Sequence, residues 1–129
     1  MKTNRNKTNL LLLFLLGCIV TMSGCLEGSA IRTGNYYAPK PINAPIDVYL
    51  DASPETPVEE VGLVSGKGSG VNSFLTDVIE VLQDQARRLG ADAVMVTNHW
   101  TELEYEIEPD GSTTTYRRVF AEGIAVRYL

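Results

Sequence analysis

The clearest hydrophobic pattern in the chain predicts an amphipathic helix between residues 75 and 89. Apolar residues recur there at the spacings that gather them on one face of an α-helix. These residues are Leu75, Val78, Ile79, Leu82, Ala86 and Leu89. Asn72 or Ser73 can cap the start, and Gly90 can take the left-handed conformation that ends a helix. Because Leu82 lies in the middle of the stripe, we expect it to be the most buried residue of the helix.

Four other segments show the alternation and the β-branched and aromatic residues that are typical of strands. They are residues 46–50, 58–65, 91–108 and 113–128. Residues 109–112 form a turn between the last two segments, whereas the glycine-rich residues 66–70 are expected to end the second strand. The order β-β-α-β-β predicts an α+β fold. We expect a single small domain in which a mainly antiparallel sheet has one helix packed on one face.

The apolar run near the N-terminus predicts an export signal rather than a membrane span. Residues 10–20 are apolar and follow three basic residues, but a span needs roughly 20 apolar residues. The run leads into Met22-Ser23-Gly24-Cys25, which resembles the lipobox of bacterial lipoproteins. That resemblance implies that residues 1–24 are a signal peptide, cleaved between Gly24 and Cys25. It also implies that Cys25 carries S-diacylglycerol and N-palmitoyl groups.

A second Gly-Cys pair, Gly17-Cys18, is an alternative lipidation site. Cleavage there would leave an apolar run of only about seven residues, the lower limit for such signals, and would keep further apolar residues in the mature chain. We therefore place the lipid on Cys25, with an uncleaved or differently processed N-terminus as the remaining alternative. The residue after Cys25 is Leu26 rather than Asp. The absence of Asp at this position resembles the pattern that sorts lipoproteins to the outer membrane in enterobacterium-like cells. We expect a lipid anchor in that membrane, with the domain in the periplasm or on the cell surface.

Charge and cysteine content exclude several classes of function. Three of the eleven basic residues, namely Lys2, Arg5 and Lys7, precede Cys25, so the mature chain has eight basic and sixteen acidic residues. This acidic balance argues against nucleic acid, whose phosphates demand a basic footprint. With Cys18 removed and Cys25 acylated, no thiol is left for a disulfide, a redox centre or a Cys-ligated zinc site. We expect no cofactor.

Residues 25–45 show neither a strand period nor a helix period, and they contain three prolines. We expect them to form a flexible tether between the lipidated Cys25 and a globular domain of residues 46–129. Tyr36 and Tyr37 lie within this segment. Three alternatives stay open for them: packing on the domain, contact with a partner, or an unstructured linker.

An acidic series with strand spacing lies between residues 102 and 108. It consists of Glu102, Glu104, Glu106 and Glu108. Side chains two residues apart lie on one face of a strand, about 6.5–7 Å from each other. Three interpretations of the series stay open. It is a solvated face paired with Arg117 or Arg118, a contact surface for a basic partner, or a Ca²⁺ site. Calcium needs six to eight converging oxygens, which a straight strand spreads apart, so no metal site is predicted. The candidate partner surface consists of Glu102, Glu104, Glu106, Arg117 and Arg118.

His99 is the only histidine, and the sequence places no serine beside it. A lone histidine in a strand is typically a packed or half-exposed residue, so we assign no catalytic residue and do not expect an enzyme. The free amides at the start of the predicted helix could bind an anion weakly.

Three stretches of the chain resemble a known family. They are Val61-Gly62-Leu63-Val64-Ser65-Gly66, Arg88-Leu89-Gly90-Ala91-Asp92-Ala93-Val94-Met95, and Tyr116-Arg117-Arg118 with Gly123 following. With the lipobox, they are similar to the outer-membrane Rcs stress-sensor lipoproteins (the RcsF type) and to the small domains once labelled heavy-metal-binding. The cysteine positions of the Rcs sensors correspond here to Gly68 or Ser69, His99, Thr115 and Ala121, so the disulfides are missing.

The resemblance implies a small domain with a role in envelope stress sensing. We therefore expect a non-enzymatic, membrane-anchored envelope lipoprotein whose periplasm-facing domain binds another envelope protein. The alternatives are a purely structural envelope lipoprotein and a domain that binds a metal or an anion.

Overall fold

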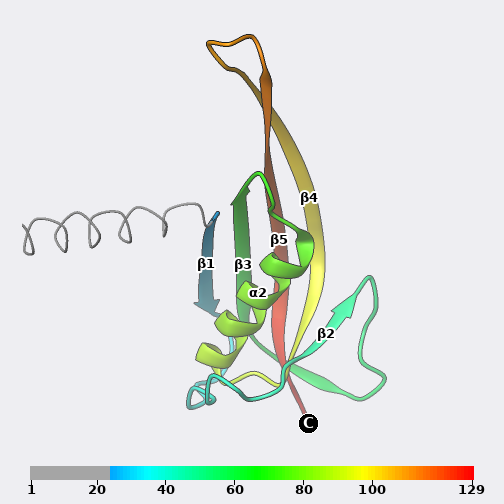
Figure 1. Cartoon of the computed structure of the whole chain (residues 1–129). Coiled ribbons are helices and arrows are strands. Elements are labelled where there is room, and N and C mark those ends of the chain that lie inside the picture. Colours follow the sequence, from blue (N-terminus) through cyan, green and yellow to red (C-terminus); the bar gives the residue numbers. More distant parts are fainter. Residues whose placement is uncertain (1–23) are drawn as a thin grey trace, which may run out of the picture.

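In the computed structural model, which describes residues 24–129, five strands form one sheet and a single helix packs against one of its faces (Figure 1). The strands are β1 (Cys25–Arg32), β2 (Asp47–Leu50), β3 (Val58–Gly70), β4 (Ala93–Ile107) and β5 (Thr113–Tyr128), and the helix is α2 (Leu75–Leu89). The strand order is β1-β3-β5-β4-β2. Strands β2 and β4 run parallel, and all other neighbours run antiparallel. The predicted α+β class, with one helix on a mainly antiparallel sheet, is confirmed.

Helix α2 supplies the centre of the hydrophobic core. Its residues Val78, Leu82 and Ala86 are completely buried against the sheet, and Leu82 is the largest of the fully buried side chains. This agrees with the position of Leu82 in the middle of the apolar stripe. Gly90 ends the helix in the left-handed conformation, with φ of 76°, also as predicted.

The start of α2 differs from the prediction. The capping residue is Phe74, and neither Asn72 nor Ser73 caps the helix. The backbone N–H of Phe74 donates to the carboxylate of Asp77 at 3.0 Å. An acidic side chain at this position is also stabilised by the positive end of the helix dipole, so Asp77 stabilises the start of α2 from within its first turn.

The glycine-rich segment continues β3 instead of ending it. Strand β3 runs through to Gly70, and its alternation turns Gly66 and Gly68 towards α2. A Cβ on Gly66 would lie 3.0 Å from Cγ1 of Val78. The prediction that residues 66–70 break the strand is therefore wrong, because these glycines allow the helix to approach the sheet closely rather than bend the chain.

Strand β1 is the main departure from the expected organisation. Residues 25–32, expected to belong to a flexible tether, pair antiparallel with β3, from Cys25 opposite Ser69 to Arg32 opposite Gly62. Backbone hydrogen bonds to the β3 edge hold this strand, and such bonds do not require an apolar period in its side chains. The sheet therefore begins at Cys25 and not at Ile46.

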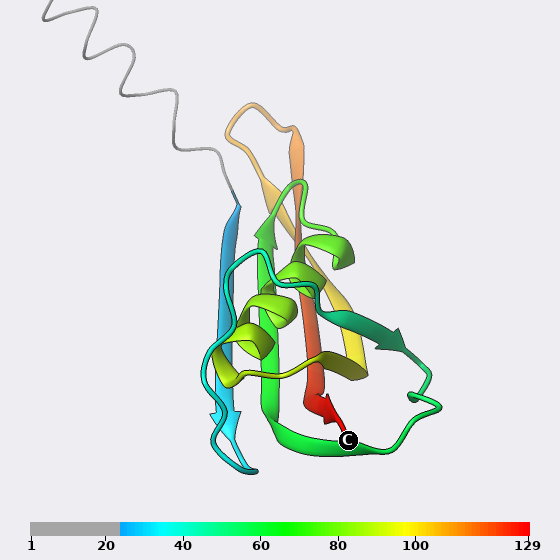
Figure 2. The same ribbon diagram turned by 90° about the horizontal axis from the view of Figure 1, so that it is seen from below.

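The rest of the expected tether runs along the C-terminal end of α2 and leads into β2 (Figure 2). The backbone N–H of Lys40 donates to the carbonyl of Arg87 at 2.8 Å, and the Arg87 guanidinium donates to the carbonyl of Ala44 at 2.7 Å. Tyr37 packs on the domain, whereas Tyr36 is 74 % exposed. Of the alternatives for the tyrosine pair, packing on the domain therefore holds for Tyr37.

The β4–β5 hairpin extends beyond the rest of the sheet. Strand β3 ends at Gly70, which pairs with Arg117, while β4 and β5 continue pairing up to Ile107 and Thr113 (Figure 1). The turn predicted at residues 109–112 closes the hairpin. The hairpin projects at the end of the sheet where β1 begins.

An uncovered sheet face as candidate functional site

Helix α2 covers one face of the sheet, and no helix or strand of residues 24–129 covers the other (Figures 1 and 2). We call this second surface the open face. Strand alternation and the pairing register assign its side chains. They include Glu27, Ser29 and Ile31 of β1, Leu63, Ser65 and Lys67 of β3, Met95, Asn98, Trp100, Glu102, Glu104 and Glu106 of β4, and Arg118, Phe120, Glu122 and Ile124 of β5.

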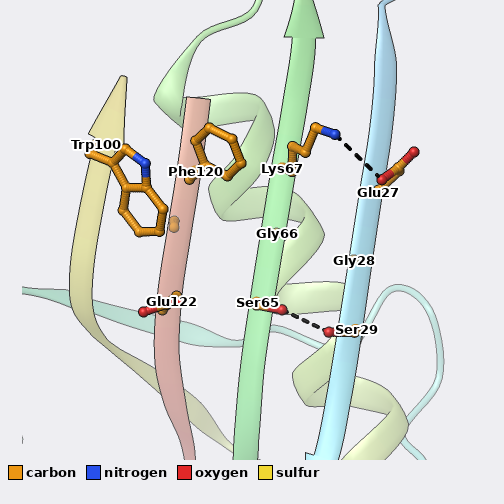
Figure 3. Close-up of a pocket in the computed structure, with 10 residues that line it drawn as sticks. Glu27, Gly28, Ser29, Ser65, Gly66, Lys67, Trp100, Phe120 and Glu122 are labelled. Carbon is orange, nitrogen blue, oxygen red and sulfur yellow. Dashed lines mark hydrogen bonds and ion pairs between the residues drawn. The ribbon is translucent and has the colours of Figure 1, made fainter. Parts of the chain in front are cut away.

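A shallow hollow of about 360 Å³ lies at the centre of the open face (Figure 3). On one side, Trp100 and Phe120 stack with ring centroids 4.9 Å apart and planes inclined by 8°. The hydroxyls of Ser29 and Ser65 form a hydrogen bond of 2.7 Å at the foot of the hollow. The four side chains come from four strands, so only the assembled sheet brings them together.

A second hollow of about 390 Å³ continues the first one along the strands. The two share Ser29, Ser65 and Glu122, and the second is also lined by the apolar side chains of Ile31, Leu63, Val64 and Ile124. Two of these, Ile31 and Leu63, are 64 % and 45 % exposed. Exposed apolar surface that lies next to an aromatic stack is typical of a binding surface rather than of a solvated sheet face.

The charged side chains of the open face are mainly acidic. Of the side chains named above, two are cations, Lys67 and Arg118, and five are glutamates. Lys67 lies 3.9 Å from Glu27, and Arg118 forms an ion pair of 2.8 Å with Glu104. The apolar hollows are therefore bordered by an excess of negative charge. The five glutamates are Glu27, Glu102, Glu104, Glu106 and Glu122.

The acidic series predicted from the sequence lies on this face. Glu102, Glu104 and Glu106 point to the same side of β4, as the spacing predicts. The negative charge of Glu106, together with a hydrogen bond to it, raises the pKa of Tyr116. Glu108 lies beyond the end of β4, and its carboxylate accepts a hydrogen bond of 3.0 Å from the Thr114 hydroxyl.

The two arginines expected beside this series lie on opposite sides of the sheet. Arg118 pairs with Glu102 across the strands and belongs to the open face, whereas Arg117 pairs with Leu103. The Arg117 guanidinium lies 5.5 Å from the centre of the Phe74 ring, on the side covered by α2. The prediction that Arg117 joins the acidic surface is therefore wrong, because adjacent strand residues face opposite ways.

The predicted lipidation site lies at the exposed start of β1. Cys25 is exposed, and its Sγ lies 3.7 Å from the carboxylate of Glu27, at the edge of the open face. Gly24, on the other side of the predicted cleavage bond, is also exposed. Residues 1–23 of the predicted signal, Cys18 included, lie outside the described residues.

None of the side-chain hydrogen bonds described for residues 24–129 joins His99 to a serine. His99 is exposed and pairs with Ala121, so it lies on the helix side of the sheet, whereas Ser65 and Ser69 lie on the other side. In residues 24–129, no three His, Cys, Asp or Glu side chains are placed to hold a metal ion. The Asp77 carboxylate already accepts from the amide at the helix start, where weak anion binding was considered.

The sequence prediction missed the aromatic centre of this face, although a signal for it exists. Trp100 continues the two-residue spacing of Glu102 and Glu104, which would have placed it with them. The partner Phe120 could not be inferred, because its position opposite Trp100 depends on the hairpin register. That register also contains an irregularity between Val96 and Asn98.

No helix within residues 24–129 combines the length and the apolar character needed to cross a membrane. Comparisons of the chain with protein-family models, with curated proteins and with solved structures find no match.

Proposed function

We propose that this chain is a non-enzymatic envelope lipoprotein, anchored in the bacterial outer membrane by lipid on Cys25, whose open face binds another envelope protein. The observation that carries the proposal is the uncovered hollow beside the Trp100–Phe120 stack, bordered by glutamates. Tryptophan is among the side chains that contribute most to protein interfaces. The resemblance to Rcs stress-sensor lipoproteins makes stress sensing the process that we propose.

The chemistry of the face specifies the kind of partner. Apolar side chains of the partner would enter the hollows and displace water from Trp100 and Ile31. Basic side chains around them would meet Glu102 and Glu106, for which the structure describes no ion pair. Complementary charge raises the rate of association and selects the register more than it increases affinity. A partner segment with an apolar centre and basic flanks fits this surface best.

The position of Cys25 supports the anchor. A lipidated cysteine must be reached by processing enzymes and must leave the domain in a direction that allows membrane attachment. Cys25 is exposed at one end of the sheet, and the Gly24–Cys25 bond precedes the first strand pair. Three acyl chains on one residue would hold the domain permanently, since two lipid signals already give stable anchoring.

Site-specific photocrosslinking in native membranes tests the proposal. A photoreactive residue at Lys67, beside the central hollow, should capture one defined envelope protein. The same residue at Glu80, exposed on the solvent side of α2, is the matched control and should not capture it. Trp100→Ala should remove the crosslinked product from the Lys67 position. If Lys67 and Glu80 give the same products, or if Trp100→Ala leaves them unchanged, the open face is not the binding site. The structural alternative would then be favoured.

A further inference from the structure

The position of Cys25 in the sheet leaves no tether between a lipid anchor and the folded domain. Cys25 is the first residue of β1 and is already paired with Ser69 of β3. Every residue after it, up to Arg32, is also paired. A lipid attached to Cys25 would therefore hold the end of the sheet directly against the bilayer surface.

The hairpin reaches past this end of the sheet. Cys25, Ser69, Arg118 and Glu102 lie in one row across four strands. Strand β4 continues five residues beyond this row to Ile107, which corresponds to about 17 Å at the usual rise of a strand. Figure 1 shows the hairpin projecting at the same end as the start of β1. An anchor at Cys25 therefore brings the hairpin to the bilayer.

The two faces of the projecting hairpin differ in polarity, one being acidic and the other apolar. Glu102, Glu104 and Glu106 point to the open-face side, whereas Leu103 and Tyr105 point to the other side. Further exposed apolar side chains lie at this end of the domain, on the first residues of β1, after β3 and at the start of α2. We call the whole set the apolar collar: Leu26, Val71, Phe74, Leu103, Tyr105 and Ile107, each at least 51 % exposed.

We propose that the apolar collar rests in the interface of the lipid bilayer and fixes the orientation of the domain on the membrane. The proposal rests on the lipid anchor at Cys25. Tyrosine is enriched at the level of the lipid head groups, and Arg117, beside Phe74, can pair with lipid phosphates. Carboxylates are costly in hydrocarbon, so the hairpin lies along the surface with its glutamates turned to water.

With the collar in the bilayer interface, the two sides of the hairpin would contact different partners. The side with Leu103 and Tyr105 contacts lipid, while the side with the glutamates stays accessible to a protein partner. The Trp100–Phe120 stack lies on that second side. A partner would therefore meet the open face next to the membrane in one orientation.

Fluorescence quenching by brominated lipids tests the contact, because the chain contains a single tryptophan. The lipidated full-length protein is reconstituted in phosphatidylcholine vesicles with brominated acyl chains. One variant combines Trp100→Phe with Tyr105→Trp, and its matched control combines Trp100→Phe with Glu104→Trp on the opposite face. The indole at residue 105 should lose most of its fluorescence, and the indole at residue 104 should keep most of it.

Two outcomes overturn the proposal, and flotation of the vesicles separates them. If the protein floats with the vesicles but the residue 105 indole is not quenched, or is quenched no more than the residue 104 indole, the anchor stands and the collar does not contact lipid. A protein partner would then be the remaining occupant of the collar. If the protein does not float, the anchor and the contact both fail. Equal thermal midpoints of the two variants show that neither substitution has disturbed the fold.

Discussion

Gly28 of β1 lies directly beneath Val81 of α2, at a distance that excludes any side chain. A Cβ on Gly28 would lie 2.4 Å from Cγ1 of Val81 and 2.7 Å from Nε2 of Gln85. The first strand is therefore held between the helix and the β3 edge. The contact also explains how a segment with so few apolar residues belongs to the folded domain.

Gly28→Val should destabilise the domain by about 1–3 kcal/mol, the usual cost of overpacking. The added side chain has to push α2 away from β1. Glu27→Val is the matched control, because Glu27 points to the open face and has only exposed contacts there, the ion pair of 3.9 Å with Lys67 and the Sγ of Cys25 at 3.7 Å. Urea unfolding measures both. Equal midpoints would show that β1 does not pack beneath the helix.

Leu82→Ala should cost about 2–5 kcal/mol, because it removes a fully buried side chain from the centre of the core. A domain of this size has a total stability of about 5–15 kcal/mol, so the loss should be large in a urea titration. Glu80→Ala, on the exposed side of the same helix, should change the midpoint little. A comparable change in both variants would contradict the assigned helix face.

Asp92 should make the stability of the domain depend on acid pH. Burial alone would raise the pKa of this carboxyl, but hydrogen bonds from Lys40 and from the backbone of Tyr128, with the nearby charges of Lys40 and Arg127, lower it below its ordinary value of 3.8. The unfolded chain then binds more protons than the folded chain in that range, so stability rises with pH. The contribution of Asp92 is complete above 3.8 and is lost as the pH falls through the lowered value.

Asp92→Asn should reduce the free energy of unfolding at neutral pH by about 1.5–3 kcal/mol, the usual size of hydrogen bonds to a charged group. The variant should also lose less stability than the wild type below pH 3.8. Urea unfolding at a series of pH values checks both. Parallel pH profiles for the two proteins would show that Asp92 is not the responsible carboxyl.

Glu102→Lys combined with Glu106→Lys should leave folding nearly unchanged, since exposed substitutions are usually within about 0.5 kcal/mol. Crosslinking of the partner from Lys67 should fall sharply, because the charge of the surface is reversed. The loss should be strongest at low salt. Glu55→Lys with Glu80→Lys makes the same charge change away from the open face and should leave the product intact. An equal yield from both double variants would mean that the glutamates only keep the face soluble.

Cys25→Ala should abolish lipidation without changing the sheet, because β1 pairs through its backbone. Metabolic labelling with a clickable fatty acid should give labelled wild-type protein and unlabelled variant. The thermal midpoint of the folded domain should be the same for both. Label that persists on the variant would place the lipid on another residue, with Cys18 as the first candidate.

Local periodicity determined the parts of the fold that the sequence predicts correctly. The apolar stripe and Gly90 specify α2, since a helix buries residues three and four apart and a left-handed residue ends it. The two-residue alternation specifies β4 and β5. It also places Glu102 and Glu104 on one face, because strand alternation is a property of a single segment.

Contacts between distant segments decided the rest. Strand β1 and the end of β3 exist because their backbones pair with each other and their glycines, Gly28 and Gly66, fit beneath α2. Neither β1 nor the end of β3 shows a periodic pattern of apolar residues in its own sequence. The hairpin register decided that Arg118 and not Arg117 faces the glutamates, and that Phe120 meets Trp100. Pairing between strands fixes such positions only when the sheet is assembled, and so only the tertiary structure creates the open face.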